Sequence, residues 1–250
     1  MENMDSQTSL NGTLIVIPAY NEAENLKSVL TELQIALPGS EVLVVDDGSI
    51  DGTADIVLAF GAPVLIMPFN VGVGGAMRAG FTYALRNGFK NVVQLDADGQ
   101  HVPSEVPRLV AELADSDVVI GSRFAYGSTS FKVSLIRRFV MKILALSLTR
   151  IAGTKLTDVT SGFRASGPNA LKLFSTSYPP EYLGDTIESL VMARRANLKI
   201  KEIPTTIRAR NHGKSSQSRF KATIYTLRAL VVLCLALIHK RAPYEVGESS

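Results

Sequence analysis

The sequence predicts an α/β protein built on a doubly wound, mostly parallel sheet, and three observations lead to this fold class. Five short apolar runs recur in the first half of the chain, at residues 14–17, 42–45, 64–67, 92–95 and 118–120. Each run is continuous rather than alternating, which is typical of strands covered on both faces. The gaps between the first four runs carry helical periodicity, as in Leu26, Val29, Leu30 and Leu33. Alternating strands and helices form a parallel sheet, which binds ligands beyond the carboxyl ends of its strands.

The second half of the chain is less regular. We expect a helix over 132–152, a polar loop over 157–164, a helix near 186–196, a strand near 199–203 and a last apolar segment over 222–238. The sequence has no internal repeat, and no Pro/Gly/Ser-rich linker separates the halves. We therefore expect a single domain over 13–216, with a flexible tail over 1–12, a hydrophobic membrane-associating helix over 217–241 and a second flexible tail over 242–250.

Charge divides the 250-residue chain into two unlike halves. Residues 1–121 hold 5 Lys+Arg and 16 Asp+Glu, a net charge of −11, whereas residues 122–250 have a net charge of +14. This split does not suit a uniformly basic nucleic-acid binder, and it indicates an anionic partner for the second half, such as phosphate or a lipid surface.

Cysteine usage and the N-terminus indicate the compartment. The single cysteine, Cys234, excludes an internal disulfide framework and a cysteine-based zinc site, and it fits a reducing compartment. The first 12 residues are polar and lack the apolar stretch of a cleaved secretory signal. We therefore expect a cytoplasmic protein.

Asp96 and Asp98 follow the fourth predicted strand, where a parallel sheet presents its ligands. Two carboxylates at i and i+2 on a turn can share one hard divalent cation, and Gln100 adds a neutral oxygen. Mg²⁺ and Mn²⁺ prefer such oxygen ligands and usually bridge to substrate phosphates. The turn therefore predicts a metal and a nucleotide-phosphate substrate, with a plain solvated turn as the alternative.

Asp46 and Asp47 follow the second predicted strand in the same way. Their carboxylates could accept hydrogen bonds from a nucleobase or a ribose hydroxyl, as an acidic residue does in dinucleotide folds. The neighbouring Asp51 and Thr53 suit a turn and a helix start, so capping explains part of this acidic run without a ligand.

Four glycines follow the third predicted strand, within residues 70–80. A dinucleotide fingerprint belongs in the first strand-to-helix turn, and residues 70–80 also lack the Gly-Lys-Ser/Thr of a P-loop. We expect these glycines to let the backbone approach a nucleotide, with Arg78 as a nearby cation.

The basic half places arginine and lysine beside Ser, Thr and Gly at residues 121–123, 157–164 and 208–215, with Arg137 and Arg138 between them. This combination offers charge-assisted donors and close backbone approach, which oxyanion binding needs. Surface solvation is the alternative for each of these cations.

Two segments could meet a membrane. In 132–152 the polar residues Arg138, Lys142 and Thr149 fall on one narrow helical stripe while most other positions are apolar, a pattern that fits either a core helix or an interfacial helix. The segment 222–238 contains Arg228, and its uninterrupted apolar run over 229–238 is shorter than the roughly 20 residues that a spanning helix needs. We expect it to dock or dip, with the cations of 239–241 reaching anionic headgroups.

In this order the motifs resemble the family-2 inverting glycosyltransferases with a GT-A fold, particularly the dolichyl- or polyprenyl-phosphate sugar synthases. The matching blocks are PAYNE at 18–22, DDGS at 46–49, Asn70 with its glycines, DADGQH at 96–101, GSR at 121–123, DVTSGFR at 158–164 and RNHGKS at 210–215. The resemblance implies a GT-A type sheet with C-terminal amphipathic or hydrophobic helices. It also implies a hexose transferred from a UDP- or GDP-sugar to a polyprenyl or dolichyl phosphate, with Mg²⁺ or Mn²⁺, at the cytoplasmic membrane face.

The resemblance also implies roles for individual residues. The nucleotide-sugar donor would contact Pro18, Tyr20, Glu22, Asp46, Asp47, Asn70, Gly75, Arg78, Asp96, Ala97, Asp98, Arg210, His212 and Lys214. The metal would be held by Asp96, Asp98 and Gln100. The acceptor phosphate would be held by Arg123, Arg137 or Arg138, Ser161 and Arg164. Catalysis would depend on Asp98, Arg123, Arg164 and Asp158, although Asp158 could equally be structural.

The chemistry of the acceptor leaves alternatives open. A phosphate monoester is already largely ionised at neutral pH, whereas an alcohol acceptor needs a general base, for which Asp185 and Glu188 are candidates. The sequence favours the phosphate, with transfer to a hydroxyl of a glycan or small molecule as the alternative. A non-catalytic nucleotide-sugar binder is a third possibility. A nucleotidyltransferase is a fourth, although the chain lacks the usual early Gly-rich loop.

Overall fold

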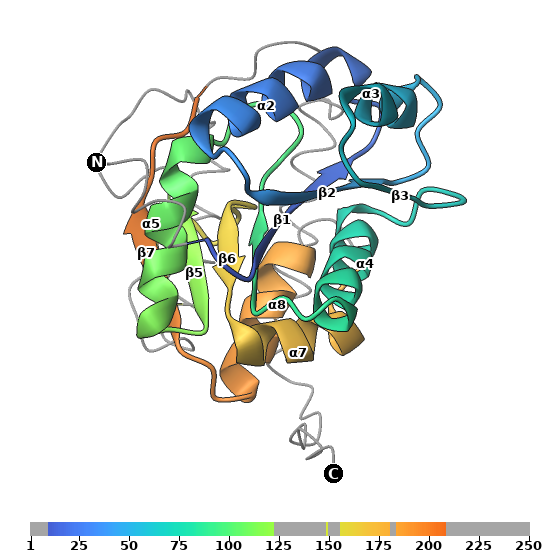
Figure 1. Cartoon of the computed structure of the whole chain (residues 1–250). Helices are drawn as coiled ribbons and strands as arrows, with labels where there is room; N and C mark the ends of the chain where they lie inside the picture. The colour runs from blue at the N-terminus through green and yellow to red at the C-terminus, as the bar shows by residue number, and fades with distance from the viewer. Residues whose placement is uncertain (1–9, 123–148, 150–155, 181–183, 209–250) are drawn as a thin grey trace, which may run out of the picture.

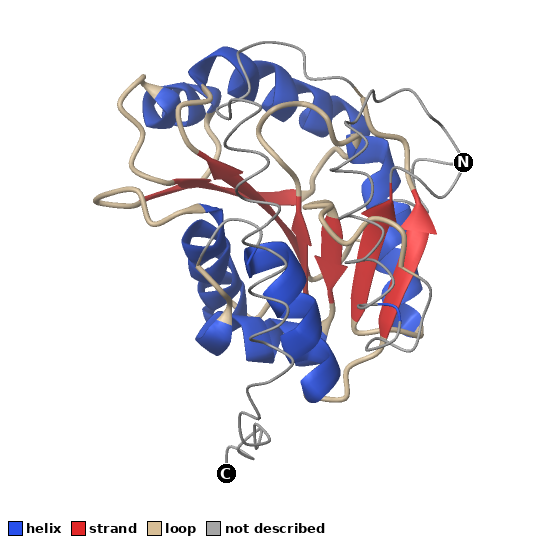
Figure 2. Ribbon diagram, turned by 180° about the vertical axis from the view of Figure 1, so that it is seen from behind, coloured by secondary structure: helices blue, strands red, loops and turns tan. Residues whose placement is uncertain are grey.

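The computed structural model describes residues 10–122, 149, 156–180 and 184–208, which form one mixed sheet between two layers of helices (Figures 1 and 2). The strands are β1 (Thr13–Ala19), β2 (Glu41–Asp46), β3 (Val64–Ile66), β4 (Asn91–Gln94), β5 (Val118–Ser122), β6 (Arg164–Ser166) and β7 (Ile200–Pro204). They lie in the order β3-β2-β1-β4-β6-β5-β7. All neighbouring strands pair in parallel except β6, which is antiparallel to both β4 and β5.

Helices cover both faces of this sheet, as the doubly wound prediction requires. They are α2 (Ala23–Ala36), α3 (Thr53–Phe60), α4 (Val73–Arg86), η1 (Pro103–Glu105), α5 (Val106–Ala111), η2 (Glu112–Ala114), α7 (Pro168–Ser177) and α8 (Gly184–Arg195). In Figure 1, α2, α3 and α5 lie on one side of the sheet and α4, α7 and α8 on the other.

The two cores follow from the alternation of side chains along each strand. On β1, Ile15 and Ile17 belong to the core beneath α2, α3 and α5, whereas Leu14 and Val16 belong to the core beneath α4, α7 and α8. All four side chains are at most 2% exposed. A continuous apolar run is therefore the pattern that this strand needs, because both of its faces are buried.

The structure confirms the five strands predicted in the first half, the strand near 199–203 and the helix near 186–196. The prediction that both faces of each strand are covered is wrong for the edge strand β3. Val64 and Leu65 are only partly buried, and Ile66 is 57% exposed. The elements β6, α5 and α7 were not predicted from the sequence.

The two segments predicted to meet a membrane, 132–152 and 222–238, lie outside the described residues apart from Thr149. Within the described ranges, no helix combines the length and the apolar character that crossing a bilayer requires. The predicted domain boundaries at 12, 216 and 241 stay predictions.

Candidate active site

Loops from both halves of the chain meet at one edge of the sheet. The parallel strands end there, and because β6 runs in the opposite direction, the residues that precede it reach the same edge. The Ser161 hydroxyl, just before β6, donates to the carbonyl of Gly121 at 2.6 Å. Past β7, the backbone N–H of Arg208 donates to the carbonyl of Gln100 at 2.9 Å. The expected ligand-binding edge is therefore built from the loops that the sequence singled out.

The turn after β4 carries the predicted metal ligands. Asp96 is 36% exposed, and Gln94 Nε2 donates to its Oδ1 at 3.2 Å. Asp98 Oδ1 accepts a hydrogen bond from the backbone N–H of Gln100 at 3.0 Å. Ala97, between the two acids, is 3% exposed and packs into the core. The turn is therefore held by its own hydrogen bonds and by a buried anchor.

The chemistry of this donor set fits Mg²⁺ or Mn²⁺. Among the described residues, no group of three or more His, Cys, Asp and Glu side chains is arranged to hold a metal ion. This turn therefore does not surround a metal with protein ligands alone. Two carboxylates and an amide instead leave coordination positions for water and substrate phosphate, which is how Mg²⁺ is usually held. A Cβ on Gly162 would lie 3.1 Å from both Asp96 carboxylate oxygens, so this glycine keeps the space beside Asp96 open.

Two residues of this turn region were given no role by the sequence. His101 is 5% exposed, its Nδ1 accepts a hydrogen bond from the backbone N–H of Asp96, and its Nε2 lies 3.6 Å from Asp96 Oδ2. Gly162 packs against the same carboxylate from the loop before β6. Both lie within the recognised sequence blocks, but their contacts with Asp96 arise only from the fold.

The loops after β1 and β2 are joined by hydrogen bonds from both sides. The backbone N–H of Asn21 donates to Ser49 Oγ at 2.9 Å, and that of Glu22 donates to Thr53 Oγ1 at 3.0 Å. Tyr20 beside them is 48% exposed, and Pro18 is partly buried. The structure therefore brings together the predicted donor residues of these two loops.

Asp51 forms the turn that leads into α3 and also joins the two loops. Its Oδ1 accepts from the backbone N–H of Thr53, the first residue of α3, and its Oδ2 accepts from the backbone N–H of Ala23. Burial raises the pKa of this carboxyl, but the hydrogen bonds from Thr53 and Ala23 together outweigh burial and lower it below its ordinary value. The folded state therefore favours the ionised carboxylate.

Acid is expected to weaken the fold through Asp51. Because its folded-state pKa is depressed, its contribution to stability is present above the unfolded-state pKa and is lost as pH falls through the folded-state pKa, below roughly pH 4. Asp51→Asn should therefore lose less unfolding free energy than the wild type between pH 5 and pH 3, as measured by urea denaturation. Equal losses in the two proteins would contradict this assignment.

Asp46 and Asp47 are only 2% and 3% exposed. Burial of this degree does not suit direct contact with a nucleoside, which the sequence predicted for them. Asp47 accepts from the backbone N–H groups of Val71 and Gly72, at 2.7 and 2.9 Å, and so fixes the glycine loop. Burial raises its pKa, although these two hydrogen bonds oppose the shift. Asp46 Oδ1 accepts from the backbone N–H of Ser49 at 3.2 Å.

The glycines after β3 pack against protein, which differs from the expected approach to a nucleotide. A Cβ on Gly74 would lie 1.9 Å from the carbonyl oxygen of Pro179, and one on Gly80 would lie 2.5 Å from Val16 Cγ1. A Cβ on Gly75 would lie 2.6 Å from Val71 Cγ2, so the Val71 side chain occupies the space beside this glycine. Gly74 and Gly80 therefore allow α4 to pack closely on its neighbours, while Asn70 is exposed.

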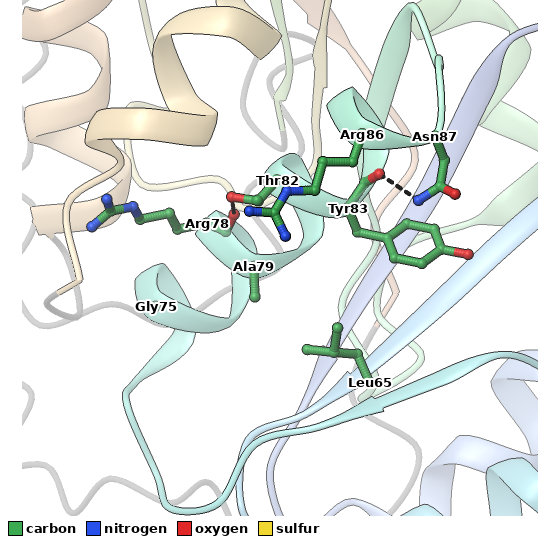
Figure 3. Close-up of a pocket in the computed structure, with 8 residues that line it drawn as sticks. All are labelled: Leu65, Gly75, Arg78, Ala79, Thr82, Tyr83, Arg86 and Asn87. Atoms are coloured by element: carbon green, nitrogen blue, oxygen red, sulfur yellow. Dashed lines mark hydrogen bonds between the residues drawn. The ribbon is translucent and has the colours of Figure 1, made fainter.

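Arg78 lies on the outward side of α4. It lines a groove with Leu65, Gly75, Ala79, Thr82, Tyr83, Arg86 and Asn87. Figure 3 shows Arg78 projecting away from Leu65 at one end of this group. Within the described residues, no hydrogen bond or ion pair joins Arg78 to the acidic turn of β4.

The loop before β6 is held from β7. The Glu202 carboxylate accepts from the backbone N–H groups of Thr157 and Asp158, at 2.7 and 3.0 Å, and from the Thr157 hydroxyl. Asp158 is 0% exposed, and Thr160 Oγ1 donates to its Oδ1 at 3.3 Å. This burial favours the structural role that the sequence left open for Asp158.

Arg164 occupies a different position from the one expected of an acceptor ligand. It is 6% exposed and donates to the carbonyl oxygens of three residues and to one hydroxyl: Ser161, Thr186, Val159 and Ser189 Oγ. Burial lowers the pKa of its guanidinium, and the charges of Tyr178, Asp185, Asp158 and Asp96 oppose that shift. Ser161 is also buried, with 3% of its surface exposed. Its hydroxyl donates to the carbonyl of Gly121 and accepts from the backbone N–H of Phe163. Both side chains are committed to the protein, where they shape the loop.

Replacing Arg164 with methionine should therefore act mainly on stability. The change would remove four buried hydrogen bonds, so we expect a loss of about 3–5 kcal/mol in unfolding free energy, measured by urea denaturation. Arg108→Met is the control: Arg108 is 43% exposed and pairs with Glu105 at the surface, so a change within about 0.5 kcal/mol is expected. Equal losses would contradict the structural role.

Six predicted site residues lie outside the described residues, and their roles stay predictions: Arg123, Arg137, Arg138, Arg210, His212 and Lys214.

Comparisons with known proteins agree with the sequence blocks. A family model described as "Glycosyl transferase family 2" matches residues 14–172. An undecaprenyl-phosphate mannosyltransferase of Micrococcus luteus is 35% identical over 82% of this chain and 87% of that protein. A polyprenol monophosphomannose synthase of Mycolicibacterium smegmatis is also 35% identical, over 82% of this chain and 81% of that protein.

Solved structures support the fold. A glucosyl-3-phosphoglycerate synthase from Mycobacterium tuberculosis, in complex with Mn²⁺, UDP-glucose and phosphoglyceric acid, aligns with a TM-score of 0.72 at 22% identity. The alignment covers 94% of this chain and 83% of that one. A second structure of that synthase, in complex with Mg²⁺ and UDP, aligns with a TM-score of 0.70 at 24% identity, over 94% and 83% of the two chains. The architecture described above is therefore the GT-A fold.

Proposed function

Because the chain belongs to glycosyl transferase family 2, we propose that it moves a hexose from a nucleotide sugar to a polyprenyl phosphate and inverts the anomeric centre. The main support for a polyprenyl-phosphate acceptor comes from the two relatives that are 35% identical. One is named an undecaprenyl-phosphate mannosyltransferase and the other a polyprenol monophosphomannose synthase. The acidic turn at the carboxyl edge of the sheet supports a donor that carries a diphosphate, since its two carboxylates and amide fit a phosphate-bridging cation.

The acidic turn would hold the cation through Asp96, Asp98 and Gln100. When bound, Mg²⁺ or Mn²⁺ would offset the negative charge that builds up on the departing diphosphate. Gln94 orients Asp96 through the hydrogen bond to Oδ1, and the Gln100 backbone orients Asp98. A turn fixed in advance does not need to reorganise during the reaction, which is the condition for effective electrostatic stabilisation.

The loops after β1 and β2 would receive the nucleoside. Tyr20 is 48% exposed, and Glu22, two residues further on, is the N-cap residue of α2. Asp46 is 2% exposed and holds the Ser49 N–H, while both carboxylate oxygens of Asp47 hold the glycine loop, so we place Asp46 behind the nucleoside as well. We place Asp47 and Gly75 behind the pocket rather than in contact with the nucleoside.

The acceptor phosphate would act as the nucleophile. One of its oxygens forms a bond to the anomeric carbon while the bond from that carbon to the diphosphate breaks, and the nucleoside diphosphate leaves. A phosphate monoester is largely ionised at neutral pH, so this step needs no general base. Asp185, the base candidate for an alcohol acceptor, is 3% exposed on α8. We further propose that the enzyme works peripherally at the cytoplasmic face of a membrane, where its lipid substrate resides.

The proposal is tested with radiolabelled GDP-mannose, UDP-glucose and UDP-N-acetylglucosamine, each supplied with Mg²⁺ or Mn²⁺. Farnesyl phosphate and farnesol form a matched acceptor pair that differs only in the phosphate. We expect one donor to give lipid-extractable label with the phosphate and none with the alcohol. Label on farnesol alone would establish the hydroxyl-acceptor alternative. Donor binding without transfer to either acceptor would contradict a transferase acting on lipids.

A further inference from the structure

The two helical layers carry opposite charge. Helices α4, α7 and α8, the basic layer, have a net charge of +3, from five cations against two acids: Arg78, Arg86, Lys172, Arg194 and Arg195 against Asp185 and Glu188. The layer of α2, α3, η1, α5 and η2, the acidic layer, has a net charge of −3, from two cations against five acids: Lys27 and Arg108 against Glu24, Glu32, Asp55, Glu105 and Glu112. The sheet lies between the two layers (Figure 1), so the charges are separated in space.

This separation differs from the division of charge along the sequence. Residues 1–121 have a net charge of −11, yet two of their five cations, Arg78 and Arg86, lie on α4, a helix without an acid. The fold places α4 beside α7, where Thr82 Oγ1 donates to the carbonyl of Ser175 at 3.1 Å. The basic layer therefore takes cations from both halves of the chain.

The outward side of α4 combines cations with apolar side chains. Arg78, Leu85 and Arg86 are exposed, and their i, i+7, i+8 spacing places them on one side of the helix (Figure 3). Among the described residues, neither guanidinium has an ion-pair partner. The groove beside them is lined by the apolar side chains of Leu65, Ala79 and Tyr83. Such a surface suits a layer of anionic lipid headgroups, where cations meet phosphates and apolar side chains enter the interface.

We propose that the basic layer docks on an anionic lipid surface, with Arg78, Leu85 and Arg86 of α4 at the headgroups. This inference rests on the peripheral work at a membrane proposed above. Attraction of the basic layer and repulsion of the acidic layer would act together to fix the orientation of the molecule. Because α4 begins at Val73, at the edge of the sheet that carries the candidate site, the docked face borders that site.

A second copy of the chain is the rival occupant, since its acidic layer complements the basic layer in charge. That contact would join two different faces and leave one of each unoccupied, so it would continue into an open assembly. A lipid surface satisfies the basic layer without this consequence.

The docking face is tested with two double variants that remove the same charge from opposite layers. Arg78→Gln/Arg86→Gln changes the basic layer, and Lys27→Gln/Arg108→Gln changes the acidic layer. The full chain is titrated with vesicles of phosphatidylcholine alone or mixed equally with phosphatidylglycerol, and the partition coefficient is measured by sedimentation. On the mixed vesicles we expect a fall of about 10–30-fold for Arg78→Gln/Arg86→Gln, at about fivefold per cation near the surface. Lys27→Gln/Arg108→Gln should stay within about twofold of the wild type, because charges on the far layer are screened.

Tryptophan reporters measure orientation independently of affinity, because the chain has no tryptophan of its own. Leu85→Trp places one on α4, and Ile35→Trp places the matched control on α2, where Ile35 is 77% exposed. In mixed vesicles that contain brominated lipid, we expect the emission of Leu85→Trp to be quenched and that of Ile35→Trp to be unchanged.

Equal losses of binding in the two double variants, equal quenching of the two reporters, or no binding of the wild type to mixed vesicles would overturn the inference. Self-association of the wild type that Arg78→Gln/Arg86→Gln abolishes, without vesicle binding, would assign the basic layer to a second copy instead. The vesicles contain no acceptor, so docking through α4 is supported even where no label reaches farnesyl phosphate. Transfer to farnesyl phosphate without vesicle binding supports the function and removes the docking surface.

Discussion

Asp98→Ala is expected to lower the rate of sugar transfer by roughly a thousandfold, because removing charge stabilisation of a leaving group has effects of this size. Asp98 supplies one of two carboxylates in the turn after β4, and its Oδ1 also accepts the Gln100 N–H. The measurement is kcat/KM for the donor that the panel identifies, at saturating metal.

Two further variants show whether charge or turn geometry is responsible. Asp98→Asn keeps an oxygen acceptor for the Gln100 N–H but removes the charge, so its loss of activity should be as large while the fold is unchanged. Asp115→Ala removes an exposed acid from the same half of the chain and should keep full activity. Full activity in Asp98→Asn would remove the metal-ligand role of Asp98.

Gly162→Ala is expected to reduce transfer by roughly 10–100-fold without unfolding the protein. An added Cβ would lie 2.9 Å from Gln94 Nε2 and 3.1 Å from both Asp96 carboxylate oxygens. These are the ends of side chains, which can move without a shift of the backbone. The movement displaces the carboxylate that would bind the cation, so the loss should be in Mn²⁺ affinity and rate rather than in stability.

Gly167→Ala is the matched control, since the same methyl group is added just beyond β6. Its Cβ would meet its nearest neighbour at 3.5 Å, an ordinary van der Waals distance. We expect wild-type activity and a melting temperature within a few degrees of the wild type for this variant. If Gly162→Ala were as active as Gly167→Ala, the space beside Asp96 would not matter for catalysis.

The sequence predicts the framework well because buried parallel strands carry a strong local pattern. The runs at 14–17 and 92–95 are apolar at every position or nearly so, and both became central strands. β6 has the sequence Arg-Ala-Ser, which has no apolar run, and it is a strand because β4 and β5 pair with it on either side. Its reversed direction is a property of the whole sheet and has no local signal.

The position of the acidic turn was predicted from the sequence, but the contacts around the candidate site were predicted only in part. The acidic turn could be read from Asp96, Asp98 and the strand before them, and it lies at the expected edge. Arg164 looked like a phosphate ligand because arginine beside Ser and Gly suits oxyanions, yet it donates to the carbonyls of Ser161 and Val159 in the loop before β6 and to the carbonyl of Thr186 in α8. Burial of a long polar side chain depends on distant residues such as Thr186, so spacing along the sequence could not distinguish these outcomes.

The reversed direction of β6 has a consequence for how this architecture can change. β5 ends at Ser122 and β6 begins at Arg164, and both points lie at the same edge of the sheet. The two ends of the connecting chain therefore lie side by side, at the edge of the sheet that carries the candidate site. That stretch can be lengthened, shortened or exchanged during evolution while strand pairing stays in register. Under the proposed function, replacement of this connection alone would change the groups that face the acceptor, while the loops proposed to bind the donor keep their positions.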